Sequence, residues 1–135
     1  MIVFDSSFLI SYHNSSDVHH NSALAIMDRF RAGEWGHGLL LEYVFLEVVN
    51  VLLRKKDLAT TQQVARSLLD AEDVQLLPCS EIFLETLAAF HQQQDTKLSF
   101  VDLSLMVAAH KYAAGNIATF DKEFRRISGV RVYPE

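Results

Sequence analysis

The feature that most constrains this chain is an almost continuously apolar stretch from Leu39 to Lys56, with the sequence LLLEYVFLEVVNVLLRKK. The stretch predicts a helix that packs as core over most of its circumference. Glu47 nevertheless lies in its middle, and Asn50 follows about one helical turn later. A carboxylate inside such a helix costs free energy unless it is paired or binds a metal ion. Glu47 therefore requires a partner elsewhere in the chain.

Length and composition indicate one domain in a reducing compartment. The chain has 135 residues, half of them hydrophobic, and a chain of this size buries roughly two-thirds of its unfolded surface. The single cysteine, Cys79, excludes an internal disulfide. No leader peptide opens the sequence, and no apolar run reaches the roughly 20 residues of a membrane helix. We therefore expect a cytoplasmic protein without a membrane segment.

The net charge bears on the kind of partner. A value of −5 argues against a broad basic surface for nucleic acid. It does not exclude nucleic acid, because bound cations can neutralise an acidic site locally.

Short β-favouring runs alternate with helical patterns along the chain. Strands are expected at 1–4, within 35–41, and at 74–77, 117–120 and 130–133. Helices are expected at 8–13, 18–31, within 39–56, from Thr60 or Thr61 to 71, and at 80–94, 98–114 and 122–127. The alternation predicts a single α/β domain over residues 1–135, with a short central parallel sheet flanked by helices on both faces.

Three aspartates occupy strand ends or helix starts in this scheme. Asp5 follows the first strand, Asp102 lies near the start of the helix 98–114, and Asp121 directly follows the strand 117–120. The carboxyl ends of the strands of a doubly wound sheet form one edge, where ligands bind. We therefore expect Asp5, Glu47, Asp102 and Asp121 to converge on one pocket at that edge.

Ordinary structural roles could explain the same residues. Asp5 could merely cap the next helix, and Ser99 with Asp102 matches a capping box. The basic end of the central helix suits the helix dipole, and it could also contact phosphates of RNA: Arg54, Lys55 and Lys56. These alternatives stay open on the sequence alone.

Four carboxylates brought together would repel one another, and a divalent cation would remove that conflict. Carboxylate oxygens are the ligands that Mg²⁺ or Mn²⁺ prefers, whereas no cysteine or histidine cluster near these acids favours zinc. Magnesium held by carboxylates also accepts phosphate oxygens. The natural reaction is metal-assisted hydrolysis of a phosphodiester.

Several segments carry a family resemblance that covers nearly the whole chain. They are VFDSSFLI, SDVHHNSA, LEVVNVLLRK, LSFVDLSLMVAAH and IATFDKEF, in that order. Together they resemble a PIN domain, most of all the VapC toxins of bacterial and archaeal toxin–antitoxin pairs. The resemblance implies an endoribonuclease, a homodimer, and a small antitoxin that blocks the site.

The resemblance also implies roles for individual residues. It gives Asp5, Glu47, Asp102 and Asp121 the task of holding Mg²⁺ or Mn²⁺ for RNA cleavage. It assigns supporting positions to Ser7, which follows the first aspartate by two residues, and to Thr119, in the pattern T-x-D. Glu47 fits better than Glu42, because Asn50 and Arg54 complete the pattern E-x-x-N-x-x-x-R.

A homodimer or a tight protein partner is also expected from the aromatic residues Phe30, Trp35, Phe83 and Phe90, which are more than a small domain easily buries.

Two rival functions remain on the sequence alone. A catalytically inactive interaction module could keep the fold and use its acids as caps and ion pairs. An aspartyl-phosphate phosphatase would carry an aspartate two residues after its nucleophile, and Ser7 occupies that place here.

Overall fold

The computed structural model describes residues 1–135 and contains one five-stranded parallel sheet. The strands lie in the order β3-β2-β1-β4-β5. Their bounds are β1 (Ile2–Phe4), β2 (Gly38–Leu41), β3 (Val74–Leu77), β4 (Asn116–Ala118) and β5 (Arg131–Tyr133). The helices are α1 (Ser6–His13), α2 (His20–Arg31), α3 (Glu42–Lys55), α4 (Leu58–Asp70), α5 (Phe83–Gln92) and α6 (Phe100–Tyr112), with 3₁₀ turns η1 (Cys79–Glu81) and η2 (Lys122–Arg126).

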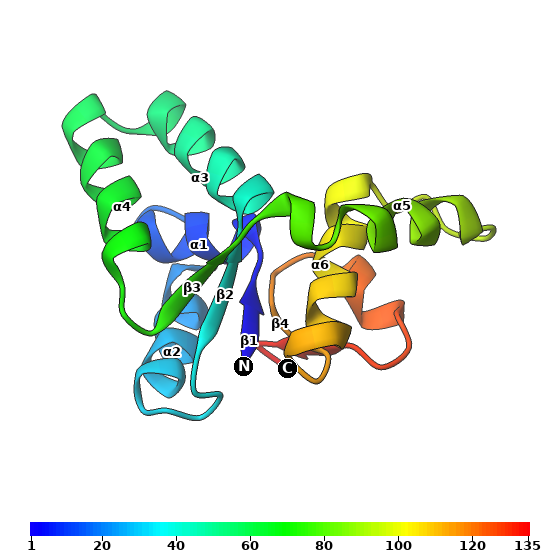
Figure 1. Cartoon of the computed structure of the whole chain (residues 1–135). Helices are drawn as coiled ribbons and strands as arrows, with labels where there is room; N and C mark the ends of the chain where they lie inside the picture. Colours follow the sequence, from blue (N-terminus) through cyan, green and yellow to red (C-terminus); the bar gives the residue numbers. More distant parts are fainter.

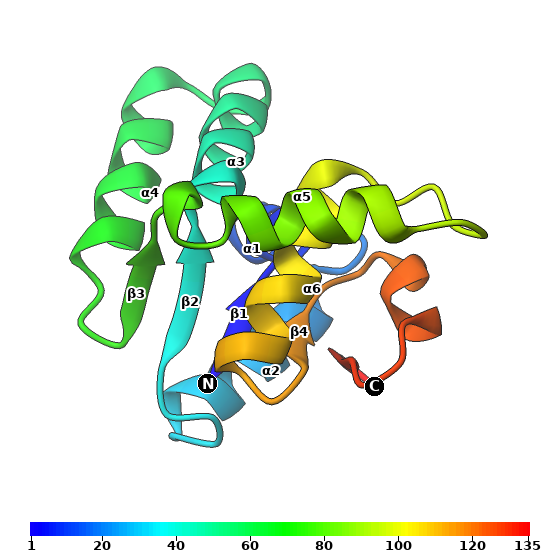
Figure 2. The ribbon, with the colours of Figure 1, turned by 45° about the vertical axis from the view of Figure 1, so that its right-hand side comes forward.

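The strand order explains how the helices are divided between the two faces of the sheet. From β1 the chain moves to β2 and then β3, whereas β4 and β5 lie on the other side of β1. Right-handed crossovers in opposite directions place their helices on opposite faces. Accordingly, α1 to α4 lie on one side of the strands, and α5 and α6 lie on the other (Figures 1 and 2). The predicted α/β fold, with a short parallel sheet between helices, is confirmed.

The apolar stretch 39–56 is not helical throughout, because its first three residues belong to the strand expected within 35–41. Leu39, Leu40 and Leu41 belong to β2, which pairs with β1 and β3 and is buried throughout. The helix α3 begins only at Glu42. Periodicity cannot separate a fully buried strand from a buried helix, because both are continuously apolar. The expected burial of most of the circumference of α3 is also wrong, since only Val44, Val48 and Leu52 are buried on it.

Smaller differences concern the ends of elements. The helix α4 is capped by Asp57, whose carboxylate accepts a hydrogen bond from the Thr60 amide at 3.0 Å, and not by Thr60 or Thr61. The strand expected at 117–120 ends at Ala118. Thr119 and Phe120 therefore lie in the loop beyond the strand. The capping box of Ser99 and Asp102 is present at the start of α6.

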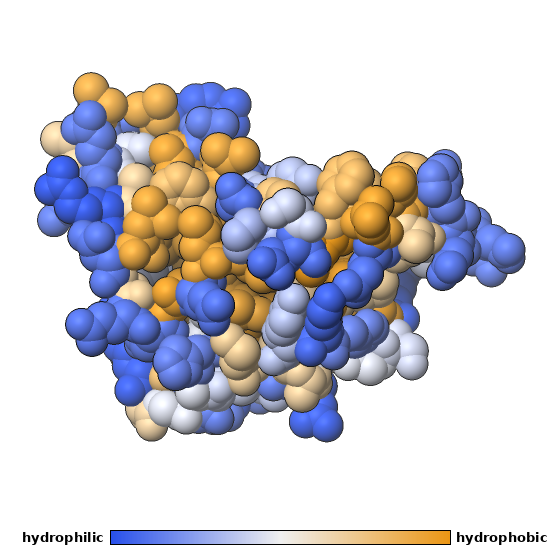
Figure 3. All heavy atoms as spheres, in the orientation of Figure 1, coloured by the Kyte–Doolittle hydropathy of each residue, from blue (hydrophilic) through white to orange (hydrophobic).

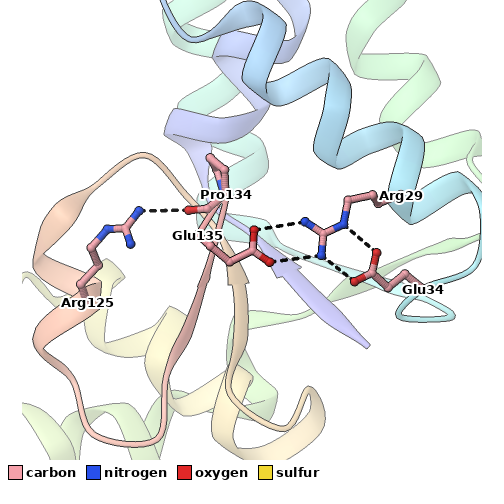
Figure 4. Close-up of polar contacts among 5 residues, drawn as sticks. All are labelled: Arg29, Glu34, Arg125, Pro134 and Glu135. Carbon is pink, nitrogen blue, oxygen red and sulfur yellow. Dashed lines mark hydrogen bonds and ion pairs between the residues drawn. The ribbon is translucent and has the colours of Figure 1, made fainter.

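The last strand is tied to the opposite half of the molecule by an arginine of α2 (Figure 4). The Arg29 guanidinium donates hydrogen bonds to Glu34, at 2.6 and 2.7 Å, and to Glu135, at 3.2 Å. It also lies over the rings of Trp35 and Tyr133, at 5.1 and 5.4 Å from their centroids. Because the Thr119 amide donates to the Tyr133 carbonyl at 2.9 Å, this contact extends to the loop after β4.

No helix in the structure is both long enough and apolar enough to cross a membrane.

Candidate functional site

The candidate site lies where the strand order reverses, between β1 and β4. Asp5 directly follows β1, and the loop from Thr119 to Asp121 follows β4. The Asp5 amide donates to the carbonyl of Ala118 at 3.0 Å, which joins the two strand ends. A crevice at the carboxyl ends of two such strands is the usual ligand site of an open α/β sheet.

Asp5 is a buried carboxylate held by hydrogen bonds on both oxygens. Its Oδ1 accepts from the Ser6 amide at 2.7 Å, so Asp5 does cap α1. Its Oδ2 accepts from the hydroxyls of Ser7, at 2.9 Å, and Thr119, at 2.6 Å. These contacts fix the carboxylate in one orientation. Capping α1 needs only the bond to the Ser6 amide, so it does not account for the two hydroxyls on Oδ2.

The same hydroxyls organise the loop after β4. Ser7 Oγ accepts from the Phe120 amide at 3.0 Å, and Thr119 Oγ1 accepts from the Asp121 amide at 3.0 Å. The Asp121 carboxylate in turn accepts from the Glu123 amide at 3.0 Å and caps η2. One network of hydrogen bonds therefore connects Asp5 with the backbone that carries Asp121.

Burial makes the charged form of Asp5 unfavourable. Desolvation raises the pKa of Asp5, while the hydrogen bonds from Thr119, Ser7 and the Ser6 amide oppose that rise. The negative charge of Asp102 raises the pKa of Asp5 further, so the two carboxylates interact electrostatically. A bound cation would relieve both effects, because it favours the ionised form of each acid.

Asp102 is a half-buried member of the capping box of α6. Its carboxylate accepts from the Ser99 amide at 3.2 Å, and its own amide donates to the Ser99 hydroxyl at 3.1 Å. The structural role proposed for Asp102 from the sequence is thus present. Asp102 thus completes the cap of α6, and its negative charge also raises the pKa of Asp5.

Glu47 makes no hydrogen bond to this network. It is exposed in the second turn of α3, as is Asn50 one turn later, so the argument that Glu47 must be compensated inside the core is wrong. Glu42 has a different role, since its carboxylate accepts from the Cys79 amide at 2.7 Å. That bond engages Glu42 with η1.

The basic residues at the end of α3 lie far from the strand ends. Arg54 and Lys55 occupy the last turn of a 14-residue helix that starts at the end of β2, and Lys56 follows. At about 1.5 Å per residue, the helix carries them roughly 20 Å from its own start.

The carboxylate and hydroxyl oxygens at this site are suitable ligands for a hard cation. The carboxylates are, however, not close enough together to form a metal site. No three His, Cys, Asp or Glu side chains form a group that could hold a metal ion. Asp5, Ser7 and Thr119 are in direct contact, Asp121 is joined to them through its amide, and Asp102 lies within electrostatic range. The convergence of all four acids, including Glu47, stays a prediction.

The structure adds basic residues that the sequence reasoning did not single out. A cavity of about 390 Å³ beside Asp102 is lined by Lys97 and Arg126, together with Glu123. The only sequence feature that could have indicated these residues is their position, since each lies within five residues of Asp102 or Asp121.

Comparisons with known proteins agree with this architecture. A sequence model of the PIN domain matches residues 2–130. Among solved structures, the chain is similar to Mycobacterium tuberculosis VapC20, described as a toxin that cleaves the sarcin–ricin loop, with a TM-score of 0.80 and 20% sequence identity. The similarity covers 96% of this chain and 97% of that one. No curated protein matches by sequence. Because the family model spans nearly the whole chain, this protein belongs to the PIN domain family.

Proposed function

We propose that this protein is a metal-dependent endoribonuclease of the VapC type, which hydrolyses RNA phosphodiesters in the cytoplasm. The observation that carries the proposal is the buried Asp5 carboxylate, held by two hydroxyls at the carboxyl ends of β1 and β4. Membership of the PIN family supports it. The likeness to VapC20, described as a toxin that cleaves the sarcin–ricin loop, points the same way.

The residues that would hold Mg²⁺ or Mn²⁺ are Asp5, Glu47, Asp102 and Asp121. A bound cation of this kind supplies an activated water and stabilises the charge that develops on the scissile phosphate. The protein's own contribution is orientation. Ser7 and Thr119 keep the Asp5 carboxylate in place, and Thr119 also fixes the Asp121 amide. Asn50, one turn after Glu47 on α3, would support this set of ligands.

RNA contacts follow from the distribution of cations. Lys97 and Arg126 line the cavity beside Asp102, where they would meet phosphates next to the scissile bond. Arg54, Lys55 and Lys56 would reach only a longer RNA, because they lie at the far end of α3.

Exposed apolar side chains support a homodimer. Leu46 and Leu53 on α3, and Phe83, Leu84 and Phe90 on α5, are between 42% and 76% exposed. Apolar surface gathers over α3 and again over α5 in Figure 3. Phe30 does not contribute, because it is buried in the core. Trp35 is half-buried and packs on Tyr133 and under Arg29.

A small antitoxin is the second protein partner that we propose, by analogy with the VapC family. An apolar cavity of about 480 Å³ between α1, α2 and the β2–β3 side of the sheet would receive an apolar segment of such a partner.

An inactive interaction module is the second candidate. The observation in its favour is that Asp5, Asp102 and Asp121 each cap a helix, which is a sufficient structural use of an aspartate.

The experiment that separates the candidates is cleavage of a structured RNA with Mn²⁺, with Mg²⁺ and with chelator, for wild type and Asp5→Asn. Asparagine caps a helix about as well as aspartate, so the inactive module predicts unchanged folding and no metal-dependent cleavage by either protein. A metal ligand predicts lost cleavage and weaker Mn²⁺ binding, with folding retained. The matched control is Asp57→Asn, because Asp57 caps α4 far from the site and should leave cleavage intact. Cleavage that survives chelation would show that the proposed mechanism is wrong.

A further inference from the structure

Four aromatic rings form a nearly parallel column that rises from the sheet to the surface. Phe4 of β1 stacks on Phe8 with 15° between the ring planes, and Phe8 stacks on Phe120 with 20°. His19 lies on Phe120 with 10° between planes and 4.3 Å between ring centroids. The two lower rings are buried, Phe120 is half-buried and His19 is exposed. The column therefore presents a flat ring to solvent on a rigid base.

The position of the column links it to the candidate site. Phe120 lies between Thr119 and Asp121, and its amide donates to Ser7 Oγ, which also donates to the Asp5 carboxylate. His19 comes from a distant part of the chain, the turn before α2, and reaches the loop by its ring alone. The exposed end of the column thus lies beside the candidate catalytic carboxylates and outside the acidic cluster itself.

The backbone of His19 is fixed even though its ring is exposed. The His19 amide donates to the Asp17 carboxylate at 2.8 Å, and its carbonyl accepts from the Ala23 amide at 2.9 Å. His19 occupies the N-cap position of α2, but its side chain makes no capping hydrogen bond. A cap residue such as Ser or Asp would stabilise the helix more, so the ring serves a contact other than the cap.

We propose that the His19–Phe120 pair is a stacking subsite for one unpaired nucleobase of the RNA next to the scissile phosphate. This inference rests on the proposed ribonuclease function and names a subsite within it. Aromatic and histidine rings hold the splayed bases of single-stranded RNA in this way, and the contact tolerates any base because each has a flat face. Such a contact also suits a protein with a net charge of −5, because stacking does not depend on a broad basic surface.

The direct test measures binding of a single-stranded oligoadenylate of about ten nucleotides, in chelator so that no cleavage occurs. One adenine is replaced by the fluorescent base 2-aminopurine, whose emission falls when it stacks. Wild type should quench the probe. His19→Ala should bind roughly 5- to 150-fold more weakly, the range measured for loss of one base–aromatic contact, and should quench less. His19→Phe should retain binding and quenching, because it keeps the flat ring.

Controls separate this inference from the proposed function. His37→Ala removes another exposed histidine, from the turn before the amino end of β2, and should bind as wild type does. Thermal melting of His19→Ala should show that the fold is kept.

Cleavage assays show whether the proposed ribonuclease function is wrong or only the proposed stacking subsite. If wild type cleaves no RNA with Mn²⁺, the proposed function is wrong. If wild type cleaves RNA but His19→Ala binds and quenches the probe as wild type does, the subsite is wrong. Loss of binding in both His19→Ala and His19→Phe would also overturn it, because it would mean that the imidazole acts through its charge or hydrogen bonds.

Discussion

At the scale of single residues, Thr119 makes two hydrogen bonds that connect Asp5 with Asp121. Its hydroxyl donates to the buried Asp5 carboxylate at 2.6 Å and accepts from the Asp121 amide at 3.0 Å. Thr119→Val keeps the shape but removes both bonds. We expect a loss of about 1–3 kcal/mol in the free energy of unfolding, measured by urea titration, because a buried carboxylate loses a partner. RNA cleavage should also fall.

Thr119→Ser is the control, because it keeps the hydroxyl and should retain most of the stability and of the cleavage. Equal stability of the valine variant and wild type would contradict the proposed role of the Thr119 hydroxyl.

His13 supplies a pH dependence at the same scale. Burial, together with the nearby charge of Arg31, lowers the pKa of His13 from 6.5 to about 4. The folded state therefore binds fewer protons than the unfolded state between pH 6.5 and 4, so stability should fall as pH falls through that window. The loss is at most about 3 kcal/mol, and it begins roughly one pH unit above 6.5, where the unfolded histidine starts to gain its proton. Urea titrations at several pH values would measure it. His13→Gln should flatten the dependence, and an unchanged slope would exclude His13 as its source.

At the scale of elements, the contact between β1 and β2 depends on a glycine. A Cβ on Gly38 would lie 2.3 Å from the Phe4 ring, so Gly38→Ala must displace the base of the ring column. We expect this substitution to destabilise the fold by about 1–3 kcal/mol, as overpacking does. Phe4→Leu should make room for the new methyl, so the double variant should lose less stability than the sum of the two single losses. Thermal or urea unfolding of the four proteins gives this coupling, and strict additivity would show that the two positions do not interact.

At the scale of the whole molecule, the exposed apolar side chains of α5 allow a test of the proposed dimer. Phe83 and Phe90 are 44% and 42% exposed, and Leu84 between them is 76% exposed. If they form the proposed dimer contact, Leu84→Glu should shift light-scattering mass from dimer to monomer while the circular dichroism spectrum stays unchanged. Val18→Glu is the matched control, because Val18 is 90% exposed in the turn before α2 and lies outside this contact. Wild type that remains monomeric at high concentration would remove the dimer from the proposal.

The sequence by itself determined the fold class, the parallel sheet and the order of its elements. Alternating strands and helices with buried apolar runs leave few other arrangements, because crossovers are right-handed and loops are short. It also placed Asp5 directly after a strand and the capping box at Ser99, since these depend on neighbours in the chain.

Only the tertiary structure decided the features that depend on distant contacts. The exact boundary between β2 and α3 inside the apolar stretch arises from pairing with β1 and β3, which local periodicity does not encode. The exposure of Glu47 depends on which stripe of α3 meets the core. The clamp on Asp5 joins residues more than 100 positions apart, and so does the ring column that ends at His19. Whether these side chains come into contact depends on how the whole sheet packs. No local sequence pattern predicts such contacts.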